Sequence, residues 1–272
     1  MIDAITNWIT SASDRERPFR KAVHIILHAI ASAQPLQHEM VMKGGILLGI
    51  AYDTGRFTKD IDFSTKRKYQ QFDKVVFLEC LKQALAQSSD NLGYQMECRL
   101  QGHKLKPNNI EGSFQTLKLN IGYASKVDGR AYKKLLEGMA VVKVEVDYSF
   151  NEKYMDIESI DVGGTAPVHA YGLTTLVAEK LRAILQQEVR ERFRRQDIFD
   201  LNSLLTRDYI TEDRHMPILK ALVEKALDRN IKVSQFDFSS NQIYRRAKRE
   251  YGTLASDVVG DLPDFDLSFA TV

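Results

Sequence analysis

Two aspartates, Asp60 and Asp62, are well suited to chemistry because they lie two positions apart in a segment that alternates polar and apolar side chains. Such a segment folds as a β-strand whose side chains point to opposite faces in turn. Ile61 and Phe63 should face one side, and the two carboxylates the other, ~6.5–7 Å apart. Neighbouring carboxylates repel, and a hard divalent ion with oxygen ligands, such as Mg²⁺, relieves the repulsion. The pair predicts a magnesium site that could hold a nucleotide's phosphates.

A glycine pair, Gly44 and Gly45, stands before this strand. Residues 40–42 predict a short buried strand, and apolar residues recur at helical spacing after the glycines. Glycines at a helix start let a phosphate approach the exposed N–H groups and the positive end of the helix dipole. Lys43 adds a positive charge. We therefore expect phosphate binding at the start of this helix.

A second group of carboxylates lies in the alternating segment 141–149. Glu145 and Asp147 occupy its polar face. Either one could add a third carboxylate to Asp60 and Asp62 if the two strands are neighbours in the sheet. A solvated outer face explains them equally well.

Lys180 and Asp197 lie on two predicted helices, at residues 173–187 and 195–205. Lys180 borders the apolar stripe of the first helix, Asp197 lies within the inward sector of the second, and Asp200 lies at its edge. A carboxylate on an apolar face is costly without a partner, so Lys180 is the expected partner of Asp197. The lysine either extends its ammonium to solvent or points it at a triphosphate.

Composition limits the class of protein. The chain has 272 residues, 44% hydrophobic and 27% charged, as in ordinary soluble proteins. No apolar run approaches the ~20 residues of a membrane helix, and the N-terminal segment lacks signal-peptide features, so we expect a cytoplasmic protein. Two isolated cysteines, Cys80 and Cys98, are expected to be packing residues.

Local basic clusters matter more than the net charge of +2. They are either solvated helix faces or a discontinuous track for a phosphate backbone. The clusters are Lys66–Lys68; Arg190, Arg192, Arg194 and Arg195; and Arg245, Arg246, Lys248 and Arg249.

The order of elements predicts two domains. A boundary near Ala166, marked by Gly163, Gly164 and Pro167, separates an α/β domain at residues 1–166 from a mainly helical domain at 167–272. Pro35 is expected to end the helix that begins near Pro18. Further expected elements are a helix at 72–86, a loop at 88–93, strands at 94–101 and 114–123, a polar loop at 104–112, and helices at 216–227 and 240–251.

Strand, Gly-Gly, helix, loop and D-x-D in this order resemble the opening of the polymerase-beta-like nucleotidyltransferase fold. In detail, KGGILLGIAYDTGRFTKDIDFS is similar to the AbiEii/AbiGii-type toxins, whose opening runs K-G-G, an apolar helix and R-x-T-x-D-[IL]-D. Arg56, Thr58, Asp60 and Asp62 fall on that pattern. Ile46 departs from the wider superfamily, where many members have Gly-Ser, and leaves the phosphate to backbone groups and Thr58.

Two later motifs extend the resemblance to the helical half. AEKLRA and RRQDIFDL match the family's E-K-L-x-A and [RK]-x-D-[IL]-[FY]-D-L, which places Lys180 and Asp197 as catalytic residues. Asp200 is the alternative if the register shifts by one turn. The family also often carries an apolar-D-apolar strand, which favours Asp147 over Glu145.

The resemblance implies a nucleotidyltransferase fold, with a mixed sheet, flanking helices and a mostly helical C-terminal half. It also implies transfer of a nucleotide from a nucleoside triphosphate (NTP), with Mg²⁺ and release of pyrophosphate. The implied catalytic residues are Asp60, Asp62, Lys180, Asp197 and Thr58; the nucleotide-binding residues are Lys43, Gly44, Gly45, Arg56, Thr58 and Lys180; the metal ligands are Asp60, Asp62 and Asp147.

The resemblance further implies the toxin of a bacterial toxin–antitoxin or phage-defence pair, with an antitoxin encoded nearby. We expect an RNA acceptor, tRNA near its 3′ end, contacted by Arg190, Arg192, Arg194 and Arg195. Two alternatives stay open. One is a small-molecule transferase of the antibiotic-adenylating kind, and the other is a non-catalytic nucleic-acid-binding protein on a transferase fold.

Overall fold

The computed structural model describes residues 4–109, 111–187, 190–231, 233, 238 and 240–272. These fall into two compact units. The first comprises Met1–Ala51, Lys59–Glu152 and Ile157–Ala170; the second comprises Tyr52–Thr58, Lys153–Asp156 and Tyr171–Val272. The second unit therefore includes two short segments that precede the predicted boundary near Ala166.

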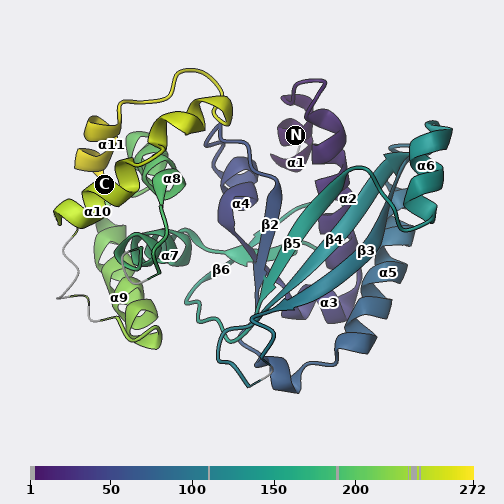
Figure 1. Cartoon of the computed structure of the whole chain (residues 1–272), viewed down its shortest axis with the longest axis horizontal. Coiled ribbons are helices and arrows are strands. Elements are labelled where there is room, and N and C mark those ends of the chain that lie inside the picture. Colours follow the sequence, from purple (N-terminus) through teal and green to yellow (C-terminus); the bar gives the residue numbers. More distant parts are fainter. Residues whose placement is uncertain (1–3, 110, 188–189, 232, 234–237, 239) are drawn as a thin grey trace. The chain divides into compact units, whose positions relative to one another are not determined.

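A seven-stranded mixed sheet forms the centre of the first unit (Figure 1), as the sequence predicted. Its strand order is β3-β4-β5-β2-β1-β7-β6. β2 runs parallel to β5, and β1 runs parallel to β7, while the β1–β2, β3–β4 and β4–β5 pairs are antiparallel. The strands are β1 Val41–Lys43, β2 Asp60–Ser64, β3 Met96–Lys106, β4 Thr116–Ser125, β5 Lys143–Ser149, β6 Ile157–Ile160 and β7 Val168–Tyr171.

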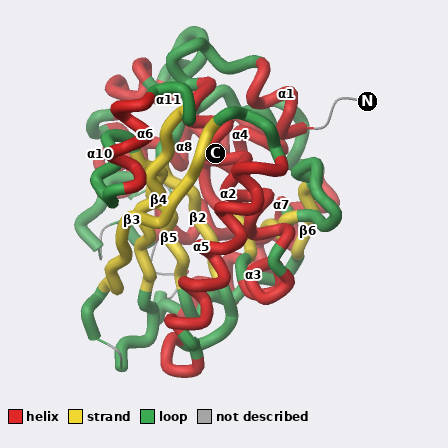
Figure 2. Tube along the Cα trace, turned by 90° about the vertical axis from the view of Figure 1, so that its right-hand side faces the viewer, coloured by secondary structure: helices red, strands yellow, loops and turns green. Residues whose placement is uncertain are grey.

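The central strands of the sheet bury one face and keep the other polar. Apolar side chains alternate along β2, β4 and β5, and those of Phe63, Leu117 and Val144 are 0% exposed. Helices α2 (Arg17–Ser32) and α5 (Lys74–Asn91) lie side by side and pack against the sheet (Figures 1 and 2). Burying each large apolar side chain stabilises the fold by ~1.5–3 kcal/mol. The polar residues of the same strands are left on the opposite face.

Pro35 does not end a helix as predicted. It stands in the first turn of a separate helix, α3 (Gln34–Glu39), after Ala33 has taken an extended conformation. The first turn needs no backbone donor, and proline already has the helical φ.

Two other expectations about local structure were wrong, and three elements were missed. α5 runs to Asn91 through the predicted loop at 88–93, and Ser88 is buried. β3 continues to Lys106 because β4 pairs with it along its whole length. The strands β6 and β7 and the helix α6 (Gly129–Leu136) were not predicted, because their short segments carry little periodic pattern.

The second unit is mainly helical. α7 (Leu173–Leu185) contacts α8 (Arg195–Thr206) and α9 (Glu212–Asp228), and α8 contacts α10 (Asn241–Lys248) and α11 (Phe265–Thr271). The second unit also contains the 3₁₀ turn Tyr251–Ser256. Further elements of the first unit are α1 Ala4–Thr10, α4 Gly44–Ala51 and the 3₁₀ turn Tyr69–Gln71. Within the described ranges, no helix is both long and apolar enough to cross a membrane.

Candidate active site

Four carboxylates share the polar face of β2 and β5. The parallel register pairs Asp60 with Glu145 and Asp62 with Asp147. Paired residues on neighbouring strands point to the same face. Partial burial, and then the charges of Glu145 and Asp147, raise the pKa of Asp60 above its usual value. The face therefore concentrates negative charge and favours a bound cation.

Lys118, on β4, extends this face. It pairs with Asp147 in the β4–β5 register, and its Nζ lies 2.9 Å from Oδ1 of Asp147. Burial alone would lower the pKa of Lys118. The contact with Asp147 and the charges of Glu145 and Asp60 outweigh burial and raise the pKa above its usual value. No sequence motif marks this lysine. The alternation of β4 places it on the polar face, but only the pairing with β5 places it beside Asp147.

The glycine pair meets the aspartate strand at Gly44. β1 pairs with β2 so that Lys43 lies opposite Asp62, and α4 begins at Gly44. Gly44 has a φ of +81°, and a Cβ on it would lie 2.1 Å from Oδ2 of Asp62. Only glycine adopts this conformation freely and leaves room for the carboxylate. The two sequence motifs are thus parts of one local arrangement.

The carboxylate oxygens suit Mg²⁺, which prefers hard oxygen ligands. Asp60 and Asp62 lie on one strand, as predicted, next to the start of α4, and their role as metal ligands stays a prediction. Among the residues that the structure describes, no group of three or more His, Cys, Asp or Glu side chains is arranged to hold a metal. Lys118 already binds one oxygen of Asp147. A role for Asp147 as a metal ligand stays a prediction.

A buried ion cluster occupies the second unit. Nζ of Lys180 donates to Oδ1 of Asp197 at 2.9 Å and to Oδ2 of Asp200 at 2.6 Å. Nε and Nη2 of Arg56 donate to the two oxygens of Asp200, both at 2.8 Å. The expected pairing of Lys180 with Asp197 is confirmed. The idea that Lys180 extends into solvent is wrong, because the residue is only 7% exposed.

Asp200 is more deeply placed than the sequence suggested, with 0% of its surface exposed. Burial alone would raise its pKa, but Arg56 and Lys180 lower it to about 2. Burial likewise opposes the charge on Lys180, and Asp197 and Asp200 raise the pKa of the lysine above its usual value. The cluster therefore stays charged at neutral pH.

The two aspartates of the cluster differ in how fully they are bonded. Both oxygens of Asp200 accept hydrogen bonds. Oδ2 of Asp197 is buried without a hydrogen-bond partner in the described part of the chain, and Nη1 of Arg194 lies 3.7 Å away. Asp197 is therefore less fully hydrogen-bonded than Asp200 within the described residues, and its Oδ2 has only the longer ion pair with Arg194.

Arg56 and Thr58 belong to the second unit, whereas Asp60 and Asp62 belong to the first. Thr58 is half-buried. Both hydrogen bonds of Arg56 described above go to Asp200, which indicates a structural task for the arginine. The predicted roles of Arg56 and Thr58 in nucleotide binding stay predictions.

Two of the three basic clusters lie together in the second unit. Arg190 and Arg192 are exposed, and Arg195 donates to the backbone oxygen of Glu250 at 3.1 Å. The guanidinium of Arg249 lies 4.7 Å from the ring centroid of Phe193. Segments separated by about fifty residues are therefore neighbours in space.

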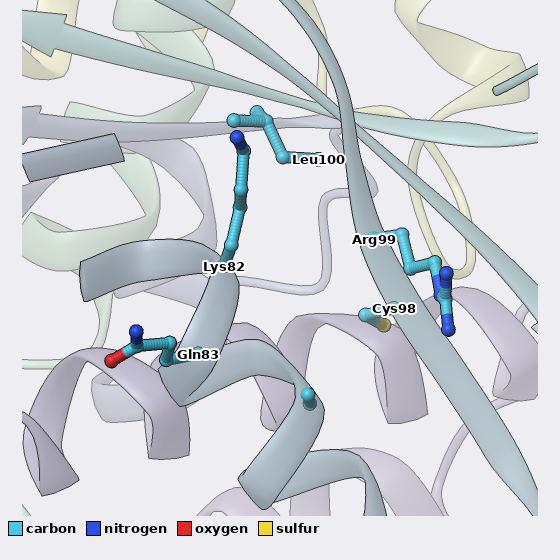
Figure 3. Close-up of a pocket in the computed structure, with 6 residues that line it drawn as sticks. Lys82, Gln83, Cys98, Arg99 and Leu100 are labelled. Carbon is cyan, nitrogen blue, oxygen red and sulfur yellow. The ribbon is translucent and has the colours of Figure 1, made fainter. Parts of the chain in front are cut away.

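A pocket of about 390 Å³ lies between α5 and β3 of the first unit (Figure 3). Its lining includes none of the predicted site residues: Lys82, Gln83, Ala86, Cys98, Arg99 and Leu100. Cys98 is buried, and burial raises the pKa of its thiol, which agrees with the prediction of a packing residue. We assign no chemistry to this pocket.

Residues 25–271 match a family model described as "Nucleotidyl transferase AbiEii toxin, Type IV TA system". The chain belongs to this family. The match covers both the carboxylate face and the ion cluster, and it confirms the resemblance seen in the motifs. This AbiEii-family chain is therefore a nucleotidyltransferase toxin, and the type of system implies an antitoxin partner.

Solved structures agree with the fold. MenT4, a nucleotidyltransferase toxin from Mycobacterium tuberculosis H37Rv, is 15% identical with a TM-score of 0.52, over 98% of this chain and 92% of that chain. JHP933 from Helicobacter pylori is 18% identical with a TM-score of 0.47, over 90% of this chain and 92% of that one. A comparison with curated proteins found no match. At this identity, MenT4 shows a shared fold.

Proposed function

We propose that this AbiEii-family toxin uses Mg²⁺ to transfer a nucleotide from an NTP to RNA in the cytoplasm. The observation that carries the proposal is the contact between the two motifs, in which the carboxylate of Asp62 lies against the backbone of Gly44. Groups that hold a metal and groups that accept a phosphate are thereby adjacent.

Asp60 and Asp62 would hold the ion, and the ion would offset the charge of the triphosphate and of the departing pyrophosphate. The N–H groups at the start of α4, at Gly44 and Gly45, would bind phosphate oxygens, assisted by the helix dipole. Lys43 lies at the same strand end, and its Nζ pairs with Oε1 of Glu152 at 3.8 Å. These groups position the triphosphate and stabilise its charge.

The reaction joins an acceptor hydroxyl oxygen to the α-phosphorus and breaks the bond between that phosphorus and its bridging oxygen. Pyrophosphate leaves, and the hydroxyl proton needs an acceptor. Asp197 suits this task because its Oδ2 has no hydrogen-bond partner in the described chain. Lys180 would orient Asp197 and keeps a third ammonium hydrogen that could bind a phosphate.

RNA is the favoured acceptor, and tRNA near its 3′ end is the specific expectation. Support comes from the arginines of residues 190–195, which lead directly into α8, the helix that carries Asp197. Backbone phosphates held by these arginines would bring an RNA end to that helix. A small-molecule acceptor is the alternative outcome of the experiment below.

The test combines purified protein with each α-labelled NTP, Mg²⁺ and total cellular RNA, followed by separation of RNA, protein and small molecules. We expect label on RNA, loss of labelling with a chelator, and loss in Asp60→Ala and Asp62→Ala. Glu137→Ala, an exposed residue after α6, is the matched control and should label normally. Label found only on protein or small molecules would refute the RNA acceptor. Transfer to tRNA that is lost when the 3′-terminal nucleotides are removed would support the specific target.

A role in phage defence is part of the same proposal. Expression of the wild-type chain should arrest growth, and Asp62→Ala should not. The antitoxin is expected among the products of neighbouring reading frames, and its co-expression should restore growth. Equal plaque numbers on cells carrying the wild-type pair and the pair with Asp62→Ala would argue against defence.

A further inference from the structure

The second unit contains a pocket of about 340 Å³ with a basic and aromatic lining: Phe193, Gln242, Arg245, Arg246 and Arg249. Four of these residues belong to α10 or its C-terminal cap, and Phe193 comes from the segment before α8. The volume lies within the range of ~300–1,000 Å³ that is usual for small-ligand sites.

The walls of this pocket are held in place by buried contacts. Ile243 and Ala247, on the other side of α10, are 0% exposed. The side chain of Gln187 donates to the backbone oxygen of Ile243 at 2.8 Å, and Ser240 caps the helix start by accepting from the backbone N–H of Gln242. A fixed α10 presents its arginines at constant spacing.

Phe193 and Arg249 form a stacked pair at the pocket, 4.7 Å from guanidinium carbon to ring centroid. Phe193 is half-buried and Arg249 is exposed, so the stack reaches the surface. Flat stacks of aromatic and guanidinium groups bind nucleobases, because every base has a planar π-face. The carboxylates of an acidic peptide would pair with the arginines but would not stack on the phenylalanine ring.

Within the described part of the chain, carboxylates do not neutralise the arginines of the pocket. Lys248, on the same helix, binds Asp266 at 2.8 and 2.9 Å. In contrast, no salt bridge joins Arg245, Arg246 or Arg249 to a carboxylate within the described residues. Positive charge also gathers around Arg190 in this unit. Burial lowers the pKa of Arg190, and the nearby charges of four other arginines lower it further: Arg229, Arg182, Arg192 and Arg194. Attraction of helix C-termini for cations explains some arginines on α10, but not the pocket or the phenylalanine.

We propose that this pocket binds one nucleotide of a single-stranded segment of the acceptor RNA. Arg245 and Arg246 bind its phosphates, and the base stacks on the Phe193–Arg249 pair. The guanidinium fork matches phosphate geometry, which favours arginine over lysine here. The inference rests on the proposed RNA acceptor and adds the surface that recognises it.

The test measures binding of the full chain to a fluorescent single-stranded RNA oligonucleotide by anisotropy, without NTP, across a salt series. The variant Arg245→Ala/Arg246→Ala should bind at least tenfold more weakly, and its log–log salt slope should be smaller by about 1.4, for two phosphate contacts at ~0.7 each. Phe193→Leu should weaken binding about fivefold to a hundredfold with an unchanged slope, since it removes stacking and no charge.

Two controls accompany these variants. Arg130→Ala removes an exposed arginine on α6 and should bind RNA like the wild type. Arg245→Lys/Arg246→Lys keeps the charge and should restore the slope with only part of the affinity. Circular dichroism and thermal unfolding should show that all variants are folded.

Wild-type affinity in both the Arg245→Ala/Arg246→Ala and Phe193→Leu variants would overturn the pocket proposal. Competition by polyglutamate as strong as that by RNA would overturn it in favour of an acidic protein partner. Labelling of RNA by the wild type together with unchanged binding in the variants would reject the pocket and leave the proposed function intact. Weakened binding in the variants without any RNA labelling would retain the pocket and reject RNA as the acceptor.

Discussion

Arg56 and Asp200 lie 144 positions apart in the sequence and form a two-bond ion pair, with both donor–acceptor distances at 2.8 Å. Asp200 is fully buried and also accepts from Lys180. The pair fastens the segment Tyr52–Thr58 to α8 inside the second unit. The arginine of the R-x-T-x-D-x-D motif thus has a structural task that the motif alone does not reveal.

Asp200→Asn should lower the free energy of unfolding by about 3–5 kcal/mol, because it leaves buried Arg56 and Lys180 short of negative charge. Urea unfolding measures this change. Asp197→Asn should lower the free energy of unfolding less, since Arg56 does not bind Asp197. The same variant should lose nucleotide transfer under conditions in which it is folded. Equal stability loss in the two variants would contradict the distinction between them.

Acid should weaken the ion cluster through Asp200. Its pKa is about 2 in the folded protein and 3.8 in the reference state, so the folded form binds the proton less readily. A lowered pKa contributes stability that is present above about pH 4 and is lost as the pH falls towards about 2. The contribution is on the order of 2 kcal/mol. Urea unfolding across this range should show a steeper loss for the wild type than for Asp200→Asn; parallel curves would refute the assignment.

Gly44→Ala should lower stability and slow nucleotide transfer by more than its strained backbone conformation alone explains. The control is Gly138→Ala, because Gly138 has a similar φ of +77° and nothing within 4 Å of an added Cβ, whereas Gly44 has Asp62 at 2.1 Å. The backbone strain alone should cost each variant ~1–2 kcal/mol of stability. The overlap with Asp62 should make the loss in Gly44→Ala larger. Only Gly44→Ala should displace the Asp62 carboxylate and slow transfer by ~10²-fold. Equal transfer rates in the two variants would show that Asp62 does not need its position.

Lys118→Met should strengthen Mg²⁺ binding to the carboxylate face, because it frees Asp147 and removes a positive charge that binds it at 2.9 Å. The expected change is about threefold to tenfold in affinity, up to ~1.4 kcal/mol. The measurement is the shift of the unfolding temperature with Mg²⁺ alone, without NTP. Lys133→Met, on exposed α6, is the control and should behave like the wild type. Weaker Mg²⁺ binding in Lys118→Met would contradict the expected competition.

Much of the candidate site was predictable from local patterns. Period-two alternation identified the strand of Asp60 and Asp62, and glycines and apolar spacing marked the helix after Gly44. The helical stripes placed Lys180 and Asp197 at the apolar faces of their own helices. These features depend on residues close together in the chain, because a strand or helix repeats its side-chain directions over a few positions. Each sequence motif is also a run of neighbouring residues, and together the motifs led to the correct family.

The tertiary structure alone decided which separate segments meet. Strand order places Lys118 beside Asp147, helix packing places Arg56 against Asp200, and the end of α10 places Arg249 over Phe193. A short strand such as β7 (Val168–Tyr171) forms by pairing with its neighbours β1 and β6 in the sheet. Such contacts arise from burial and charge pairing across long separations, to which the periodicity of a single segment is insensitive. The sequence by itself therefore determined the local elements and their chemistry, and the packing of the chain determined their partners.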